Sequence, residues 1–398
     1  MKLCVLTDQM ESMAYTDQPH NSSLSLCPSA VTLLFIPSIY TLLFLTALPG
    51  NALSLWVFLR CISSVTPIHI YLSHLSISNL LLSLTSPFLT AYFARGSVWD
   101  LSSVLCQIVV HGITPVLHIN VYISLLILAW VALSRFALLI QNTHASRPST
   151  CATLLPNSFF TCLKRVSFAN TVCATVWLIS VGSIVPVTVY YSVNEAMKSR
   201  KDGEKESGGG GEMCYSPTVE LGGSTSAILS TLPMVLFFVL YFLVLVSYVT
   251  LLRHIRRSHR NAHIPTSQSL LTRVFRNIVV IQVVLSVCLL PYHIFKPIFM
   301  TLAHQPHLLL SPGVGSCHPL SVLIEVKNCL ILLAALRGST DPIMYFLLDR
   351  AFRHQTLRLF WPNQTNSSRQ EAFWSTTDKI ETVNTVTASV DTGHGGVL

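Results

Sequence analysis

The sequence predicts an all-α membrane protein, a seven-transmembrane helix bundle that ends in a short cytosolic amphipathic helix. The first observation is composition: 51% of the 398 residues are hydrophobic and only 11% are charged, whereas a soluble domain carries about 25% charged residues. The second is that the apolar residues gather in seven blocks, each long enough for the roughly 20 residues that cross a bilayer. So many blocks in one chain disfavour the alternative of buried helices in a large soluble protein.

The predicted bundle occupies residues 31–348 and follows an N-terminal segment, residues 1–30. Its spans are Val31–Leu59, Ile68–Phe93, Cys106–Ile140, Phe168–Tyr191, Ala227–Leu252, Val274–Leu302 and Ser321–Leu348. The amphipathic helix is predicted over residues 349–361, with Phe352 and Phe360 on its membrane face. Residues 362–398 form a Ser/Thr-rich tail with few apolar residues, a composition that predicts disorder.

Arginine and lysine in the connections orient the bundle, because cytosolic loops of membrane proteins are enriched in both. The first, third and fifth connections carry basic residues and no acid, and further arginines follow the seventh span. These segments are therefore predicted to be cytosolic and the N-terminus extracellular, at the plasma membrane. This topology explains the formal net charge of +8, which is too dilute for nucleic-acid binding. Asn21, in Asn21-Ser-Ser, is then an acceptor for N-glycosylation.

The outward-facing cysteines suggest two disulfide bridges. A bridge between Cys106 and Cys214 would pin the second outer loop over the mouth of the bundle, and one between Cys27 and Cys317 would tie the N-terminus to the last outer loop. Free thiols are the alternative for both pairs. The sequence contains no CxxC and no P-loop, GxGxxG, HExxH or GxSxG motif. It therefore predicts no enzyme, no cofactor and no metal site.

Several polar and helix-breaking residues interrupt the apolar spans, where each is costly and calls for a functional reason. The array resembles the rhodopsin-like (class A) G-protein-coupled receptors from Val31 to about Trp361. The matching landmarks are Asn51, Arg135, Trp177, Pro291 and Asp341-Pro342-Ile-Met-Tyr345. Pro87, the Cys27/Cys317 pair, Pro291-Tyr-His293 with Lys296, and Asp341 resemble the purinergic-type branch. Residues 69–75, 184–192 and 292–299 resemble one receptor within that branch.

The resemblance implies a receptor in which an extracellular ligand shifts the helices and a heterotrimeric G protein docks on the cytosolic face. It assigns G-protein coupling to Arg135, with Tyr248 and Tyr345 joining it in the active packing and with bending at Pro291 and Pro342. It further implies that receptor kinases and arrestin act at the tail. Two departures, Ser134 in place of an acid and Leu289 in place of a tryptophan, leave open a ligand-binding protein without coupling. A transporter is less favoured, because the two halves of the chain do not mirror each other.

The ligand pocket is predicted near the outer third of the sixth span. Lys296 and His293 are three residues apart on nearly the same helix face, where a cation and an imidazole would suit a carboxylate or phosphate. Tyr292, Tyr122 and Lys327 are further candidate contacts. A nucleotide, an anionic lipid and a peptide carboxylate all remain open as ligands.

Arg337 is the most unusual residue of the sequence, a cation in the middle of the seventh span. Asp341 lies four residues on, within ion-pair reach on the same helical face. Asn51, Asn79, Asn120 and Ser124 match positions that surround a sodium ion in related receptors, but Asn79 replaces the aspartate that holds the ion there. We therefore expect Arg337 to take the place of sodium, paired with Asp341 and hydrogen-bonded by the asparagines.

Overall fold

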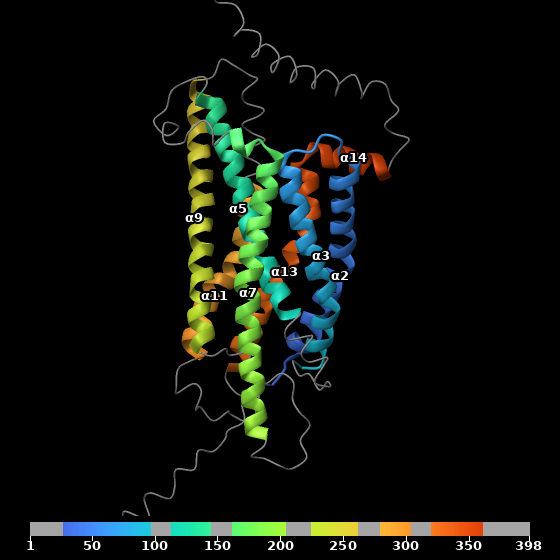
Figure 1. The fold of residues 1–398 in the computed structure, drawn as a ribbon, viewed down its shortest axis with the longest axis vertical. Coiled ribbons are helices and arrows are strands. Elements are labelled where there is room, and N and C mark those ends of the chain that lie inside the picture. The colour runs from blue at the N-terminus through green and yellow to red at the C-terminus, as the bar shows by residue number, and fades with distance from the viewer. Residues whose placement is uncertain are drawn as a thin grey trace, which may run out of the picture.

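The computed structural model describes residues 27–96, 113–144, 161–203, 224–261, 279–303 and 320–360, and these ranges contain helices and no strand. Figure 1 shows long helices standing side by side, with one short helix across an end of the bundle. The α-helices are α2 (Ile36–Trp56), α3 (Pro67–Ala94), α5 (Thr114–His144), α7 (Val166–Gly203), α9 (Ser224–Asn261), α11 (Leu290–Ala303), α13 (Leu320–Leu348) and α14 (Arg350–Phe360). The π-helical segments η1 (Val31–Phe35) and η2 (Val57–Cys61) extend α2 at its two ends. A further π-helical segment, η4 (Leu285–Leu289), immediately precedes α11.

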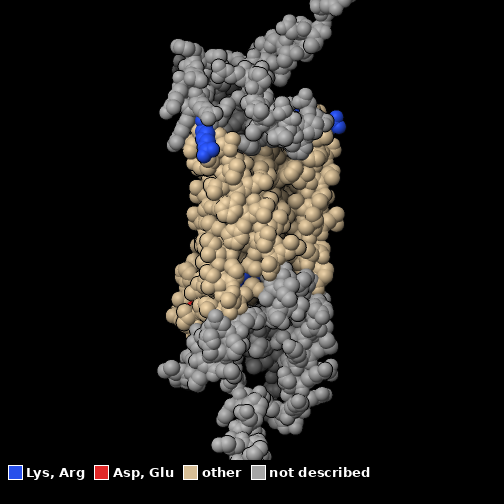
Figure 2. Space-filling model, turned by 90° about the vertical axis from the view of Figure 1, so that its left-hand side faces the viewer, with Lys and Arg blue, Asp and Glu red and all other residues tan. Residues whose placement is uncertain are grey.

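Six of the helical segments are long and apolar enough to cross a membrane, namely Val31–Cys61, Pro67–Ala94, Pro115–Ser134, Val166–Pro186, Thr231–Thr250 and Val279–Leu302. The helix α13 is not among them, and it carries four charged residues, Glu325, Lys327, Arg337 and Asp341. It nevertheless stands inside the bundle and packs along α2, α3, α5 and α11. On the face shown in Figure 2 a broad uncharged band crosses the molecule, with prominent Lys/Arg patches at the end where α14 lies in Figure 1.

The helices agree with the predicted spans in place and order, but two of them are clearly longer: α9 continues past the predicted end at Leu252 to Asn261, and α7 is likewise extended at its C-terminal end. The fourth span was expected to end at Tyr191, with the charged run 198–206 in a loop, but α7 continues into this run as far as Gly203. The helix can continue beyond the membrane-spanning part, Val166–Pro186, because Glu195, Ala196, Met197 and Lys198 are good helix formers. Cys106, the predicted start of the third span, and residues 274–278 of the sixth lie outside the described residues.

The sixth span changes its helical pitch just before Pro291, the second residue of α11. Proline has no backbone N–H and its ring clashes with the preceding turn of an α-helix. The wider π-helical turn η4 immediately precedes it, as is common where a helix accommodates such an interruption. The sequence-predicted bend at Pro291 therefore coincides with a change of helix type.

The first and seventh spans approach each other very closely at Gly50. A Cβ atom added at this residue would lie 3.1 Å from Cγ of Pro342, tighter than an ordinary contact. Glycine thus allows α2 and α13 to pack backbone against side chain at mid-membrane. The main apolar core surrounds this contact and includes Leu75, Leu125, Leu128 and Tyr345.

Candidate functional site

A polar network lies in the middle of the bundle around Arg337 of α13, whose side chain has no exposed surface. Its Nη1 donates to Oδ2 of Asp341, four residues along the same helix. Its Nη2 donates to Oδ1 of Asn79 at 3.0 Å and to Oδ1 of Asn120 at 3.3 Å. The same nitrogen donates to Oγ of Ser124. One guanidinium therefore joins α13 to α3 and α5.

Asn79 is the second centre of this network, because its amide both accepts and donates. Its Nδ2 donates to Oδ2 of Asp341 at 2.7 Å and to Oδ1 of Asn51 at 3.1 Å. Asn51 in turn donates to the carbonyl oxygens of Ala47 and Gly338, each at 2.8 Å. The first, second, third and seventh spans are thus connected by one set of buried hydrogen bonds.

Three polar atoms beside these contacts have no hydrogen-bond partner among the described residues: Nε of Arg337, Oδ1 of Asp341 and Oη of Tyr345. Buried polar groups in proteins are usually satisfied by protein or by ordered water. The other polar side-chain atoms of the network form hydrogen bonds inside the bundle. The cluster thus contains one cation and one carboxylate, Arg337 and Asp341, whose opposite charges lie side by side.

The residues predicted to couple to a G protein, Ser134, Arg135, Tyr248 and Tyr345, lie toward the end of the bundle that carries α14 (Figure 1). Tyr345 is fully buried there, and Tyr248 is half-buried on α9. Ser134 is at the same end of α5, and its Oγ has no partner among the described residues. Arg135 follows it in α5, but its side chain lies outside what the structure describes. The geometry of its predicted contacts with the two tyrosines therefore stays a prediction.

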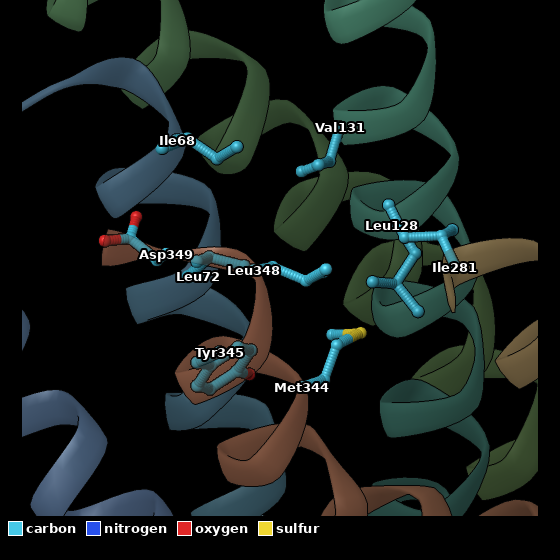
Figure 3. A pocket seen from close by; sticks show the side chains of 9 residues that line it. All are labelled: Ile68, Leu72, Leu128, Val131, Ile281, Met344, Tyr345, Leu348 and Asp349. Carbon is cyan, nitrogen blue, oxygen red and sulfur yellow. The ribbon is translucent and has the colours of Figure 1, made fainter. Parts of the chain in front are cut away.

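A small cavity of about 20 Å³ opens beside Tyr345. Figure 3 shows Leu128, Val131 and Ile281 on one side of it, and Tyr345 and Leu72 on the other. Its wall is completed by Ile68, Met344, Leu348 and Asp349. Its lining residues come from the second, third, sixth and seventh spans, at the end where the G protein is predicted to dock.

Sequence reasoning missed a contact that joins the start of α3 to the corner between α13 and α14. Nε2 of His69 lies 3.1 Å from Oδ2 of Asp349, and the two side chains are 6% and 9% exposed. His69 also takes part in a capping box with Thr66, whose N–H donates to Nδ1 at 3.2 Å. Asp349 accepts from the backbone N–H of Phe352 at 2.8 Å and so caps α14. Thr66-Pro67 in the sequence could have indicated the start of α3 and its capping box, but not the contact of His69 with Asp349.

The predicted ligand residues gather at the opposite end, around α11. The rings of Tyr122 and Tyr292 lie 6.3 Å and 5.3 Å, between centroids, from that of His293. Lys296 is partly exposed, with Nζ 5.7 Å from the ring centroid of Tyr292. His293, by contrast, is fully buried and stacks on Phe237 with the ring centroids 3.7 Å apart. Its Nδ1 pairs with the carbonyl of Leu289, and only Nε2 lacks a partner among the described residues.

The expectation that His293 opens onto the cavity together with Lys296 is therefore corrected. A residue three positions earlier in a helix lies one turn deeper, and there Phe237 of α9 covers the face of the imidazole. Lys327 of α13 stands with Nζ 5.1 Å from the ring centroid of Phe299. The structure thus brings Lys296, Tyr292 and Tyr122 together and places Lys327 on the neighbouring helix.

Other predicted positions fall wholly or partly outside the described residues. Asn21, Cys106, Cys214 and Cys317 lie outside them, as does the tail from residue 361. Cys27 takes part in a disulfide, but the pairing with Cys317 stays a prediction.

Comparison with known proteins identifies the class. The family described as "7 transmembrane receptor (rhodopsin family)" matches residues 50–345, so the chain belongs to this family of G-protein-coupled receptors. The match ends at Tyr345 of α13, and it thereby identifies α13 as the seventh span. Receptors of this family imply coupling to a G protein and an extracellular ligand, and they give no support to a transporter.

The chain is similar to probable G-protein coupled receptor 82 of Homo sapiens, with 37% identity over 325 residues that cover 81% of this chain and 90% of that receptor. This receptor is the one that residues 69–75, 184–192 and 292–299 resemble. The chain is also similar to a purinoceptor of Rattus norvegicus, at 27% identity over 78% of this chain and 74% of that receptor. The uracil nucleotide/cysteinyl leukotriene receptor of Homo sapiens is 24% identical over 79% of this chain and 73% of its own length. The predicted purinergic-type branch is thereby confirmed.

Proposed function

We propose that this receptor responds to an extracellular ligand that carries a carboxylate or a phosphate. The observation that carries the proposal is the placement of two lysines on adjacent helices, at the end of the bundle opposite α14. Lys296 of α11 lies over Tyr292 and Lys327 of α13 over Phe299. An ammonium group that lies against an aromatic face still has three rotatable N–H donors that it can offer to an anion.

The similarity to a receptor named for uracil nucleotides and cysteinyl leukotrienes supports an anionic ligand, since both of those molecules are anions. It does not select among nucleotide, lipid and peptide. Each lysine offers an ammonium group, which binds carboxylate and phosphate alike as a point charge. An acidic group is therefore the feature that the site recognises, whichever molecule carries it.

The remaining parts of the proposal concern the membrane and the cytosolic side. The N-terminus is extracellular and the protein resides at the plasma membrane, as the basic odd-numbered connections support. The heterotrimeric G protein binds at the end with α14, where Arg135, Tyr248 and Tyr345 form the coupling site. The basic amphipathic helix α14 lies on membrane lipid, and receptor kinases and arrestin act at the tail.

The test is an agonist screen in cells that carry a panel of G-protein sensors. Uracil nucleotides, cysteinyl leukotrienes, single-chain anionic phospholipids and peptides with a free C-terminal carboxylate are applied to the parent receptor. For each agonist found, Lys296→Ala should reduce potency about tenfold or more, as expected for a lost charge-assisted contact, without lowering surface expression. Lys296→Arg is the matched control that keeps the charge. Unchanged potency of every agonist on Lys296→Ala would overturn the proposed site.

A further inference from the structure

At the outer end of the first span, nearby residues satisfy only part of the helix start. The π-helical segment η1 starts at Val31, and the preceding Ala30 offers no side-chain hydrogen bond. The first N–H groups of any helix have no partner within the helix and must find one elsewhere. In Ser29 the chain does have a local acceptor, which takes the N–H of Val31 at 3.0 Å. The next N–H, that of Thr32, is satisfied from a distant helix.

That partner is Glu325 of α13. Its Oε1 accepts from the backbone N–H of Thr32 at 3.0 Å and from Oγ1 of Thr32 at 2.7 Å, across 293 residues of sequence. The same oxygen accepts from Oγ of Ser29. Thr32 is 6% exposed, so its two bonds with Glu325 are partly buried, whereas the bond from Ser29 is exposed. A carboxylate is also favoured at this place by the positive end of the helix dipole.

The residues just before the first span are held by contacts with the same helix and with α3. The N–H of Cys27 donates to Oγ of Ser321 on α13 at 3.4 Å. Pro28 lies so near Gly96, at the end of α3, that a Cβ atom there would be 3.1 Å from Cγ of Pro28. Gly96 has a φ of 77°, a conformation that glycine adopts without strain.

We propose that Glu325, on the seventh span of the same chain, caps the start of the first span. It is also the positioning residue that docks the N-terminal segment on α13. The first helix then reaches its full length only when the last helix is in place. At mid-membrane the same two helices are joined by Asn51 to Gly338 and by Thr46 to Ser339. With Glu325 at the outer end, α2 and α13 form one unit along the outer half of the bundle, whichever ligand the receptor binds.

Hydrogen exchange of the purified full-length receptor in detergent, read by mass spectrometry, tests this role. Glu325→Ala should raise the exchange rate of the amides in residues 31–35 about tenfold, in the range of a lost helix cap, and leave the amides around Asn51 unchanged. Glu325→Gln keeps an oxygen that can accept from Thr32, so its exchange should lie between those of Glu325→Ala and the parent. Val322→Ala, at a 65% exposed position of the same helix, is the matched control and should behave as the parent.

A second variant keeps the test decisive if Glu325→Ala does not accumulate. Thr32→Val removes the hydroxyl donor of Thr32 from the other side of the contact. It leaves Glu325 intact and keeps Ser29 as the acceptor of the Val31 N–H. It should also speed exchange in residues 31–35. Parent-like exchange in this variant or in Glu325→Ala would overturn the proposal. An equal acceleration in Val322→Ala would overturn it too, because the effect would then not belong to the carboxylate.

Discussion

Arg337 carries a full charge into the part of the molecule where solvation by water is least available. The burial of an isolated charge costs several kcal/mol, and only good partner geometry offsets that cost. Asp341 supplies the countercharge, and Asn79, Asn120 and Ser124 accept the remaining hydrogen bonds of Nη2. Nη1 and Nη2 of the guanidinium are thus bonded by side chains from three helices, whereas Nε has no partner among the described residues.

Arg337→Ala should destabilise the receptor by about 3–5 kcal/mol, the range for breaking a buried pair from one side, because Asp341 remains buried without its cation. Thermal unfolding of the purified receptor and its folding yield measure the loss. The matched control is Arg337→Met combined with Asp341→Asn, which removes both charges and should recover part of the stability. A well-expressed Arg337→Ala variant with the parent's melting temperature would contradict this description of the network.

Because a guanidinium of the chain already pairs with Asp341, a sodium ion is not needed there. We expect that replacing sodium chloride by choline chloride at equal ionic strength leaves the melting temperature and the basal signalling of the receptor unchanged. Both are measured on the same preparation in the two salts. Stabilisation by sodium alone would show that the ion still binds and that the network is arranged differently.

Ser134 precedes Arg135. In the receptors that the chain resembles, an acidic residue at this position holds the arginine in the inactive packing. A serine has no charge to supply, so we expect raised basal signalling from the parent receptor. Ser134→Asp should lower it, as read by the G-protein sensors without added ligand and normalised to surface expression. A silent parent whose activity rises on that substitution would refute this prediction.

At the scale of elements, α14 is too short to be stable alone and is held by its N-terminal cap, Asp349, and by ring contacts with the bundle. It has 11 residues, fewer than an isolated helix needs to be stable in water. Phe352 packs its ring 5.0 Å from that of Phe58, between centroids, and Tyr345 lies against both. The bond between His69 and Asp349 adds a polar link from the start of α3 to the cap of this helix.

Asp349→Ala should therefore cost about 1–2 kcal/mol, because it removes the cap of α14 and the partner of His69 together. The loss is measured as a lower melting temperature and as faster hydrogen exchange in residues 350–360. His354→Ala, an exposed position on the same helix, serves as the control and should change neither quantity. Parent-like exchange in Asp349→Ala would mean that the aromatic contacts alone hold α14.

The elements also differ in how the bundle joins them. The first, second, third and seventh spans share the polar network. The sixth span meets the fifth through ring contacts, such as that of His293 with Phe237, and through a hydrogen bond of 3.1 Å between Tyr241 and Ser286. Aromatic contacts are less directional than buried charged hydrogen bonds, so they can be exchanged at lower cost. The π-turn η4 before Pro291 lies in the same sixth span.

At the scale of the whole molecule, the predicted bridge between Cys106 and Cys214 would hold the second outer loop over the bundle. A disulfide typically stabilises by about 2–4 kcal/mol. Cys106→Ser and Cys214→Ser should each reduce surface expression sharply, as measured by labelling of intact cells. Cys173→Ser, at a buried free thiol of α7, gives a comparison for the general effect of losing a cysteine. Normal surface levels of both bridge variants would show that the bridge is absent or unimportant.

Much of the candidate site could be predicted from local spacing together with the family resemblance. The Arg337–Asp341 pair follows from a separation of four residues in a helix, and Asn51, Asn79 and Asn120 follow from matching landmark positions. His293 was placed wrongly because its depth depends on Phe237, which belongs to another helix. The contact of His69 with Asp349 gave no local signal, since the two residues are 280 positions apart.

The sequence by itself determined that this protein is a helical membrane receptor, because span length, apolar composition and helix-breaking residues are local properties that any fold of the chain must satisfy. The tertiary structure alone decided which distant side chains satisfy one another. Asn79 and Asn120 meet Arg337 across 258 and 217 residues, and Glu325 caps the first span across 293. Such pairs depend on how the helices are rotated and stacked, and that arrangement is set by packing of the whole bundle.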